Sequence, residues 1–276
     1  MKIDGREIAN QILEDLKIRV AKLKTKNVFP HLYIILLSSD ASSESYVKQK
    51  MLRAEEIGVK ITLDRENPEI STKELLEKIN NLNKDNLVHG IIVQRPLPQA
   101  LTQEKIASAV LPEKDVDGFN PNSKFGVPVA LAILKMLKTV HPENFNDWLH
   151  QQKICVIGKG ITAGKPIVNL FKKLNIKNKI VDSKTNNRKE ILKNSDIIIS
   201  AVGKPDVFKS SEIKKGVILI GVGLHKEADE KFHVDFNQEE IQNIVSFYSP
   251  TPGGAGPVNV AMLLKNLVEA SENQVS

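Results

Sequence analysis

Apolar and polar residues alternate in blocks along the first half of the chain, and these blocks predict alternating strands and helices. Continuous apolar runs are typical of strands buried on both faces, whereas apolar residues at helical spacing indicate helices. The predicted strands are Leu32–Leu37, Val59–Leu63 and Val88–Val93, and the predicted helices are Glu44–Ile57, Thr72–Leu82 and Thr102–Val110. This βαβαβ order predicts a parallel sheet with right-handed crossovers.

The second half repeats the pattern and predicts a second parallel sheet. The predicted strands are Lys153–Ile157, Lys179–Asp182, Asp196–Val202, Val217–Ile220 and Val245–Tyr248, and the helices between them are Ala163–Leu174 and Asn187–Lys193. Two amphipathic helices, Val127–Leu137 and Asn259–Ala270, flank this half, and the apolar spacing of the last predicts docking onto the first domain. The fold class is therefore α/β, with a three-layer N-terminal domain and a Rossmann-like nucleotide-binding domain, both with mainly parallel sheets.

Composition narrows the class of protein. With 276 residues, 41% hydrophobic and 26% charged, the chain is ordinary for a globular protein and long enough for two domains. No apolar run reaches the length of a membrane span, and no signal peptide opens the chain, so no membrane partner is predicted. Cys155 is the single cysteine, which excludes an intrachain disulfide and fits a cytoplasmic location. The six histidines lack metal-ligand spacing, so no metal is assigned.

The net charge of +6 raises the question of nucleic-acid binding. The alternative is a surface on which lysines are spread over solvated helix faces. No nucleic-acid motif is present and aromatic residues are only 5% of the chain, so the second interpretation is favoured and no nucleic-acid partner is predicted.

A glycine turn predicts a dinucleotide site. The stretch from Gly158 to Ala163 has the pattern G-x-G-x-x-A between a predicted strand and a predicted helix, where glycines let the backbone approach a pyrophosphate. The next strand ends at Asp182, a position where a carboxylate favours the ribose diol of NAD. The neighbouring Ser183 and Lys184 favour a 2′-phosphate instead, as does Lys159, and the residues leave the choice open.

Polar side chains gather at the ends of elements in the first half. Tyr46 and Lys50 are four residues apart on a predicted helix and therefore share one face. Gln94 follows a buried strand at its carboxyl end, where ligands bind in open α/β sheets. Asp117 lies in a glycine-terminated turn, and Asp115, in the same turn, is interpreted as a structural turn residue.

Read together, these motifs resemble one enzyme family. The motifs are Tyr46 with Lys50, Gly90–Pro98, Lys114–Phe119, Gly158–Pro166, Ala201–Pro205 and Pro252–Pro257. Their order and spacing are similar to those of the bifunctional methylenetetrahydrofolate dehydrogenase/methenyltetrahydrofolate cyclohydrolase family, over nearly the whole chain. The resemblance implies a folate-binding catalytic domain at 1–127, completed by a C-terminal helix at 257–276, and a Rossmann-like NAD(P)-binding domain at 128–256.

The resemblance also implies an activity. It is the oxidation of 5,10-methylenetetrahydrofolate with NAD(P), followed by hydrolysis of 5,10-methenyltetrahydrofolate to 10-formyltetrahydrofolate. These steps make the chain a multifunctional oxidoreductase and hydrolase of one-carbon metabolism and purine biosynthesis. The implied cofactor is NADP, with NAD as an alternative because of Asp182, and the implied assembly is a homodimer that binds tetrahydrofolate derivatives.

Site residues are carried over position by position. The implied catalytic residues are Lys50, Tyr46, Gln94 and Asp117. The implied substrate contacts are Tyr46, Lys50, Gln94, Pro96, Leu97, Asp117, Pro252, Gly253 and Gly254. The implied cofactor contacts are Gly158, Lys159, Gly160, Ile161, Gly164, Ser183, Val202, Gly203, Gly223 and Leu224.

Departures from the family pattern lie mainly on the cofactor side. The loop before Val127 is short, Lys159-Gly160 replaces an Arg-Ser pair, and the family's Asp-Val-Gly-Ile-Asn becomes Gly221 to His225, while Asn259 replaces a threonine. These changes keep alternatives open: a cyclohydrolase with weakened dehydrogenase activity, a dehydrogenase for another small substrate, or a non-catalytic binding protein on the same scaffold.

Overall fold

The computed structural model describes residues 1–37, 41–226 and 231–274, which form two compact units. The three-stranded unit comprises residues 10–128 and 260–276, and the five-stranded unit comprises residues 1–9 and 129–259. Each unit has its own parallel sheet. The prediction of an α/β chain with two mainly parallel sheets is thus confirmed.

The three-stranded unit has the strand order β2-β1-β3. Its strands are β1 (His31–Leu36), β2 (Lys60–Arg65) and β3 (Gly90–Val93), and its helices are α2 (Ala41–Glu56), α3 (Thr72–Lys84) and α4 (Gln103–Ala109). The long helices α1 (Gly5–Thr25) and α10 (Ala255–Asn273) contribute residues to both units. Ser71 starts α3 with a capping box, because its hydroxyl accepts from the Glu74 amide while the Glu74 carboxylate accepts from the Ser71 amide.

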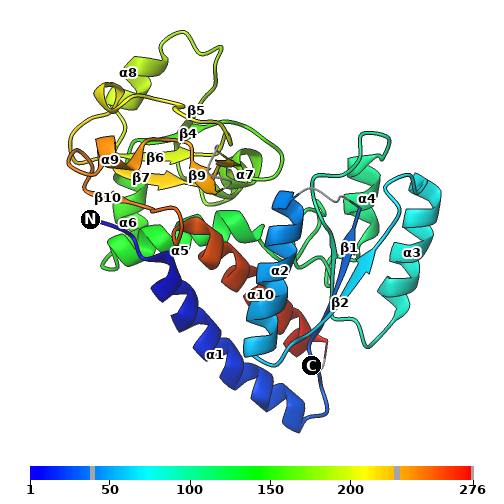
Figure 1. Ribbon diagram of the computed structural model, residues 1–276. Helices are drawn as coiled ribbons and strands as arrows, with labels where there is room; N and C mark the ends of the chain where they lie inside the picture. The colour runs from blue at the N-terminus through cyan, green and yellow to red at the C-terminus, as the bar shows by residue number, and fades with distance from the viewer. Residues whose placement is uncertain (38–40, 227–230, 275–276) are drawn as a thin grey trace. The chain divides into compact units, whose positions relative to one another are not determined.

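Helices cover both faces of this sheet (Figure 1). Ile91 and Val93 point to one face, where α3 and α4 pack through side chains such as Leu75 and Ile106. On the other face α10 packs closely against Gly90, since a Cβ at Gly90 would lie 2.8 Å from Cδ1 of Leu267. The predicted docking of the C-terminal helix onto the first sheet is therefore confirmed within this unit.

The five-stranded unit has the strand order β10-β7-β6-β4-β5. Its parallel strands are β4 (Ile154–Ile157), β5 (Asn178–Val181), β6 (Ile197–Ser200), β7 (Ile218–Gly221) and β10 (Phe247–Tyr248), and β8 (Leu224–Lys226) with β9 (Phe232–Val234) form an antiparallel pair. Its helices are α5 (Pro128–Val140), α6 (Phe145–Gln151), α7 (Gly164–Lys173), α8 (Arg188–Lys193), α9 (Gln238–Ile241) and the 3-10 helix η1 (Ser210–Glu212). Numbered one to five along the chain and read from the β5 edge, these strands lie in the order 2-1-3-4-5. Strands β5 and β6 therefore lie on opposite sides of β4, and folds of this kind bind ligands at the point where the strand order reverses, between β4 and β6.

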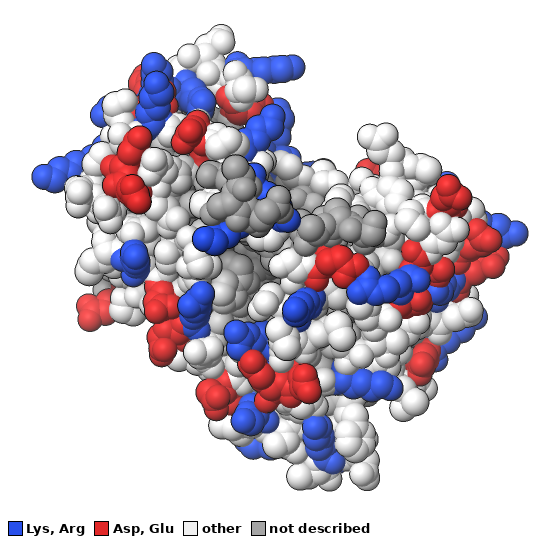
Figure 2. Space-filling model, viewed as in Figure 1, with Lys and Arg blue, Asp and Glu red and all other residues white. Residues whose placement is uncertain are grey.

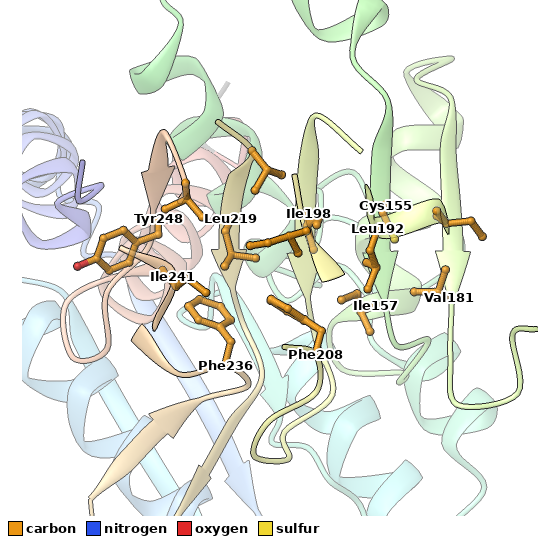
Figure 3. Close-up of a cluster of buried hydrophobic side chains, with 14 of the residues drawn as sticks. Cys155, Ile157, Val181, Leu192, Ile198, Phe208, Leu219, Phe236, Ile241 and Tyr248 are labelled. Carbon is orange, nitrogen blue, oxygen red and sulfur yellow. The ribbon is translucent and has the colours of Figure 1, made fainter. Parts of the chain in front are cut away.

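Large apolar side chains fill one face of the second sheet (Figure 3). Ile157, Ile198 and Leu219 come from three neighbouring strands, and the rings of Phe208 and Phe236, with centroids 5.8 Å apart, belong to the same cluster. Cys155 belongs to the same buried cluster, and burial raises the pKa of its thiol to about 12, so it remains a neutral core residue.

The ends of several elements differ from the predictions. Helix α10 begins at Ala255, four residues before the predicted start, because Pro257 lies in the first turn, where its missing N–H breaks no helical hydrogen bond. Helices α1 and α6 and the pair β8–β9 were not predicted. Among the described residues, no helix combines the length and apolarity needed to cross a membrane. On the face shown in Figure 2, basic and acidic side chains are interspersed.

Candidate functional site

The centre of the candidate site is Lys50, in the middle of α2. Its side chain is buried, with only 6% of the residue exposed, and its Nζ donates a hydrogen bond to Oε1 of Gln94 at 2.7 Å. A lysine without a carboxylate in hydrogen-bond contact is unusual at such burial, because transferring an ammonium group out of water is costly. The structure therefore brings together two of the predicted site residues from a helix and a strand end.

Gln94 is held in place from two sides. Its backbone N–H donates to the carbonyl of Ile35 at 2.9 Å, which extends the β1–β3 ladder by one residue. Its Nε2 donates to the carbonyl of Arg95 at 2.8 Å, so the amide oxygen is the atom that faces Lys50. This second contact fixes the orientation of the amide, so that Lys50 donates to a neutral oxygen atom.

Burial acts on both charged groups of the site. Burial lowers the pKa of the Lys50 amine, and the Asp117 carboxylate opposes this shift. Burial also raises the pKa of Asp117, and Lys50 and Arg95 oppose that shift in turn. Asp117 therefore lies within electrostatic reach of Lys50, and the site favours an amine that loses its proton more readily than an exposed lysine.

Tyr46 lies one helical turn before Lys50 on α2, so both side chains leave the same face of the helix. Burial raises the pKa of the Tyr46 phenol, which keeps it neutral and able to donate or accept a hydrogen bond. The predicted pair thus presents an amine and a phenol from one face of α2.

The turn that carries Asp117 is built by its neighbours. Lys114 is buried and its Nζ donates to three carbonyls at the end of α3, those of Leu82, Asn83 and Asp85. The carboxylate of Asp115 accepts the N–H of Asn120 at 2.7 Å, and burial raises the pKa of Asp115 to about 6. Both residues therefore support the turn, in agreement with the structural interpretation of Asp115.

Arg95 is a polar residue of this site that the sequence analysis did not single out. Its guanidinium lies 4.2 Å from the ring centroid of Phe119, and Nη1 donates to Oε1 of Gln103 at 2.9 Å. Its charge acts on Asp117, as described above. The signal was available, since Arg95 directly follows Gln94 at the same strand end.

The other predicted substrate contacts have different surroundings. Pro96 is exposed, whereas Leu97 is buried among the apolar side chains of α3 and α4. Pro252, Gly253 and Gly254 belong to the five-stranded unit, where they follow β10 and the carbonyl of Gly253 accepts the N–H of Gly5 at 2.8 Å.

In the five-stranded unit, the predicted dinucleotide turn joins β4 to α7. A Cβ at Gly158 would lie 2.7 Å from the carbonyl oxygen of Ala201, and one at Gly164 would lie 2.2 Å from the carbonyl oxygen of Gly158. These two glycines are required for close packing of the turn. A Cβ at Gly160 would meet nothing within 4 Å, so the open space beside it fits a ligand that approaches the backbone.

Charged side chains surround the neighbouring end of β5. The carboxylate of Asp182 pairs with Nζ of Lys159 at 2.8 Å and accepts the backbone N–H of Lys184 at 3.0 Å. These contacts, the Lys159 pair first, lower the pKa of Asp182 to about 2. Ser183 and Lys184 are exposed beside it.

The loops after β6 and β7 complete this group of residues. A Cβ at Gly203 would lie 3.2 Å from the carbonyl oxygen of Leu224, and one at Gly223 would lie 2.4 Å from the amide nitrogen of Gly203. Because Gly158 also packs against Ala201, the predicted residues from three loops meet at the carboxyl ends of β4, β6 and β7. Among the described residues, no group of three or more His, Cys, Asp or Glu side chains is arranged to hold a metal ion.

Comparisons with known proteins cover both units. Residues 3–117 match the family model described as the tetrahydrofolate dehydrogenase/cyclohydrolase catalytic domain. Residues 128–275 match the model of the NAD(P)-binding domain of the same family. The bifunctional protein FolD of Lactococcus lactis subsp. cremoris is 34% identical over an alignment of 283 residues, gaps included, that covers 99% of this chain and 98% of that protein.

Solved structures give the same result. The bifunctional enzyme FolD, a methylenetetrahydrofolate dehydrogenase/cyclohydrolase from Campylobacter jejuni, is similar with a TM-score of 0.92 and 32% identity, over 99% of each chain. The Trypanosoma brucei N5,N10-methylenetetrahydrofolate dehydrogenase-cyclohydrolase, solved with NADP cofactor and inhibitor, has a TM-score of 0.90 and 27% identity, over 100% of this chain and 98% of that chain.

Proposed function

This chain belongs to the tetrahydrofolate dehydrogenase/cyclohydrolase family, and from that premise we propose that Lys50 is the centre of its chemistry. The protein is a bifunctional enzyme of one-carbon metabolism with an NAD(P)-binding domain. It oxidises 5,10-methylenetetrahydrofolate to 5,10-methenyltetrahydrofolate and hydrolyses that product to 10-formyltetrahydrofolate.

The observation that carries the proposal is the buried amine of Lys50, held 2.7 Å from a neutral amide oxygen. Hydrolysis begins when water attacks the one-carbon bridge, and the attacking water must lose a proton. A lysine can accept that proton near neutral pH only when its pKa is lowered, as burial lowers that of Lys50. A proton then passes to N5 as the carbon–N5 bond breaks, which leaves the formyl group on N10.

Gln94, Tyr46 and Asp117 support this role in different ways. Gln94 holds the amine without adding a negative charge that would keep it protonated. Asp117 is a carboxylate acceptor that matches the two N–H donors on the aminopyrimidine edge of a pterin. We propose Tyr46 as a positioning contact for folate, and we assign further substrate contacts to Pro96, Leu97, Pro252, Gly253 and Gly254.

For the dehydrogenase step we propose that a dinucleotide binds at the carboxyl ends of β4, β6 and β7. When bound, it supplies the acceptor for the hydride that leaves the methylene carbon. The open space at Gly160 and the start of α7 suit a pyrophosphate. The proposed contacts are Gly158, Lys159, Gly160, Ile161, Gly164, Ser183, Val202, Gly203, Gly223 and Leu224.

We propose NADP rather than NAD as the preferred dinucleotide. Asp182 alone would favour the ribose diol of NAD, but it is already paired with Lys159. Lys159 and Lys184 together outweigh its charge, and the exposed Ser183 hydroxyl adds a donor for a 2′-phosphate. A homodimer in the cytoplasm completes the proposal, and sedimentation velocity and cell fractionation test these two parts.

The experiment is a paired assay of the wild type and Lys50→Met. For the wild type we expect oxidation of 5,10-methylenetetrahydrofolate that is faster with NADP than with NAD, and hydrolysis of 5,10-methenyltetrahydrofolate. For Lys50→Met we expect hydrolysis to fall by about 10²–10⁴-fold, the range typical of a lost general base. Methionine keeps an unbranched chain of similar length, so the fold is retained.

Lys48, an exposed lysine on the same helix, provides the matched control. Lys48→Met should hydrolyse the substrate as the wild type does. Hydrolysis by Lys50→Met at the wild-type rate would remove Lys50 from the mechanism, and a wild type that reduces neither dinucleotide would overturn the proposed cofactor site.

A further inference from the structure

Asp235 is a buried carboxylate that the sequence analysis did not identify. It directly follows β9 in the five-stranded unit and has no exposed surface. A fully buried aspartate is rare unless several donors satisfy it, so its partners indicate what it holds in place.

Four donors converge on this carboxylate, and they come from one short segment. Oδ2 accepts the hydroxyl of Ser200 at 2.7 Å and the amide of Val202 at 2.9 Å. Oδ1 accepts the amide of Gly203 at 2.7 Å and that of Lys204 at 3.2 Å. Three successive amides of the loop after β6 are therefore turned inward towards one side chain.

This arrangement decides what the loop can offer to a ligand. With their amides bound to Asp235, residues 202–204 have no backbone N–H groups for a phosphate. The loop instead presents carbonyl oxygens and the side chain of Val202, which is 39% exposed. Such a surface suits the hydroxyl and carboxamide donors of a nucleoside and an apolar ring face.

Asp235 also ties this loop to the loop after β7. A Cβ at Gly223 would lie 2.4 Å from both carboxylate oxygens of Asp235 and 2.4 Å from the amide nitrogen of Gly203. Only glycine fits at this position, so the two loops and the carboxylate form one closely packed unit at the end of the sheet.

We propose that Asp235 is a positioning residue for the dinucleotide, which holds the loop 201–204 as an acceptor surface for the nucleoside part of the ligand. This inference rests on the proposed function, since it requires a dinucleotide at the carboxyl ends of β4 and β6. The phosphates would then bind at the Gly158–Gly164 turn, where the backbone has open space beside it.

The test is Asp235→Asn, which keeps the shape but replaces one oxygen with an NH₂ group that faces two amide donors. We expect the Kd for NADP, measured by titration calorimetry, to rise by about tenfold, because hydrogen bonds to a carboxylate are stronger than those to a neutral amide. The KM for NADP should rise in parallel, whereas hydrolysis of 5,10-methenyltetrahydrofolate should stay at the wild-type rate. Hydrogen exchange at the amides of 202–204 should become faster.

Asp196→Asn is the matched control. Asp196 precedes the same strand, β6, at its opposite end, and its carboxylate accepts the Lys153 amide at 2.7 Å and pairs with Lys214. It should lower thermal stability without changing the Kd for NADP. Ser200→Ala removes only one of the four donors and should give a smaller rise in Kd, which keeps the inference testable if Asp235→Asn does not fold.

The outcomes separate this inference from the proposed function. If the wild type binds NADP and both Asp235→Asn and Ser200→Ala bind it equally well, Asp235 only stabilises the fold and the inference is wrong. If the wild type binds neither NADP nor NAD, the proposed cofactor site itself fails and the inference fails with it.

Discussion

Two aspartates, one in each compact unit, respond to their surroundings in opposite ways. Asp115, in the three-stranded unit, is buried, and burial raises its pKa to about 6. Asp182, in the five-stranded unit, is partly exposed, and its pairing with Lys159 lowers its pKa to about 2. The same chemical group is thus pushed towards the neutral form in one unit and towards the charged form in the other.

The difference matches the chemistry that each unit is proposed to carry out. Around Lys50, removal of water makes charge costly, so an amine can become neutral and exchange protons. Around Asp182 and Lys159, charge remains stable and can recognise a charged ligand by direct pairing. Under the proposed function, burial therefore governs proton transfer in one unit, whereas charge pairing governs ligand recognition in the other.

The largest expected effect concerns Asp115 and tests the role of burial. A carboxyl group with a raised pKa stabilises the folded state most below its ordinary value of 3.8, and this contribution is lost as the pH rises through about 6. The shift from 3.8 to about 6 corresponds to about 3 kcal/mol. Asp115→Asn should therefore gain about 3 kcal/mol of unfolding free energy relative to the wild type across this pH range, measured by urea denaturation.

Asp115→Ala provides the matched control. It removes the titration as well, but it also leaves the N–H of Asn120 without its acceptor. The unfolding free energy of Asp115→Ala should therefore be lower than that of Asp115→Asn by a constant amount at every pH. If the unfolding free energies of the wild type and Asp115→Asn instead differ by the same amount at every pH, burial does not raise the pKa of Asp115. The contrast between the two units would then be wrong.

Much of the fold could be predicted because the buried strands are continuous apolar runs. Strand β3 and its neighbours were found in this way, and all four residues of β3 are buried. Helix α1 was missed although its signals are present: Asp4 accepts the amides of Arg6 and Glu7 at its start, and Ile8, Leu16 and Val20 are buried at helical spacing. The pair β8–β9 is short, and its three-residue strands carry too few positions for alternation to be recognised.

The site shows a similar limit. Helix spacing and a strand end made Lys50 and Gln94 candidates, and the resemblance to the family implied the roles of Lys50, Gln94 and Asp117. Asp235 could not be proposed from the sequence. Its four hydrogen-bond donors lie within residues 200–204, and sequence spacing gives no sign of contacts across 31 to 35 residues. The role of Asp235 depends on packing in three dimensions, which local patterns do not encode, whereas Arg95 could have been identified from its place directly after Gln94.

A smaller effect is expected from the exposed pair in the five-stranded unit. Lys159→Met removes the proposed charge-assisted partner for a 2′-phosphate, so the Kd for NADP should rise by about tenfold. The Kd for NAD should stay the same or fall, because Asp182 is then free to accept the ribose hydroxyls. Fluorescence titration with both dinucleotides measures the change in preference.

Lys172→Met is a suitable control, since Lys172 is an exposed lysine at the other end of α7. It should change neither Kd. An equal loss of NADP and NAD binding by Lys159→Met would mean that Lys159 contacts a part common to both ligands, and pairing would then not explain the preference.

The smallest expected effect concerns the interaction between Asp117 and Lys50 in the three-stranded unit. Asp117 raises the pKa of Lys50 against the dominant effect of burial, so Asp117→Asn should let that pKa fall further. Because the proposed active form of Lys50 is the free amine, the rising limb of kcat/KM for hydrolysis against pH should move to lower pH. The value of kcat/KM should itself fall, since Asp117 is the proposed acceptor for the pterin. Asp115→Asn, two residues away, should leave the midpoint in place. A shift of the Asp117→Asn limb to higher pH would mean that the carboxylate does not stabilise the protonated amine, and Asp117 would then not oppose the effect of burial on Lys50.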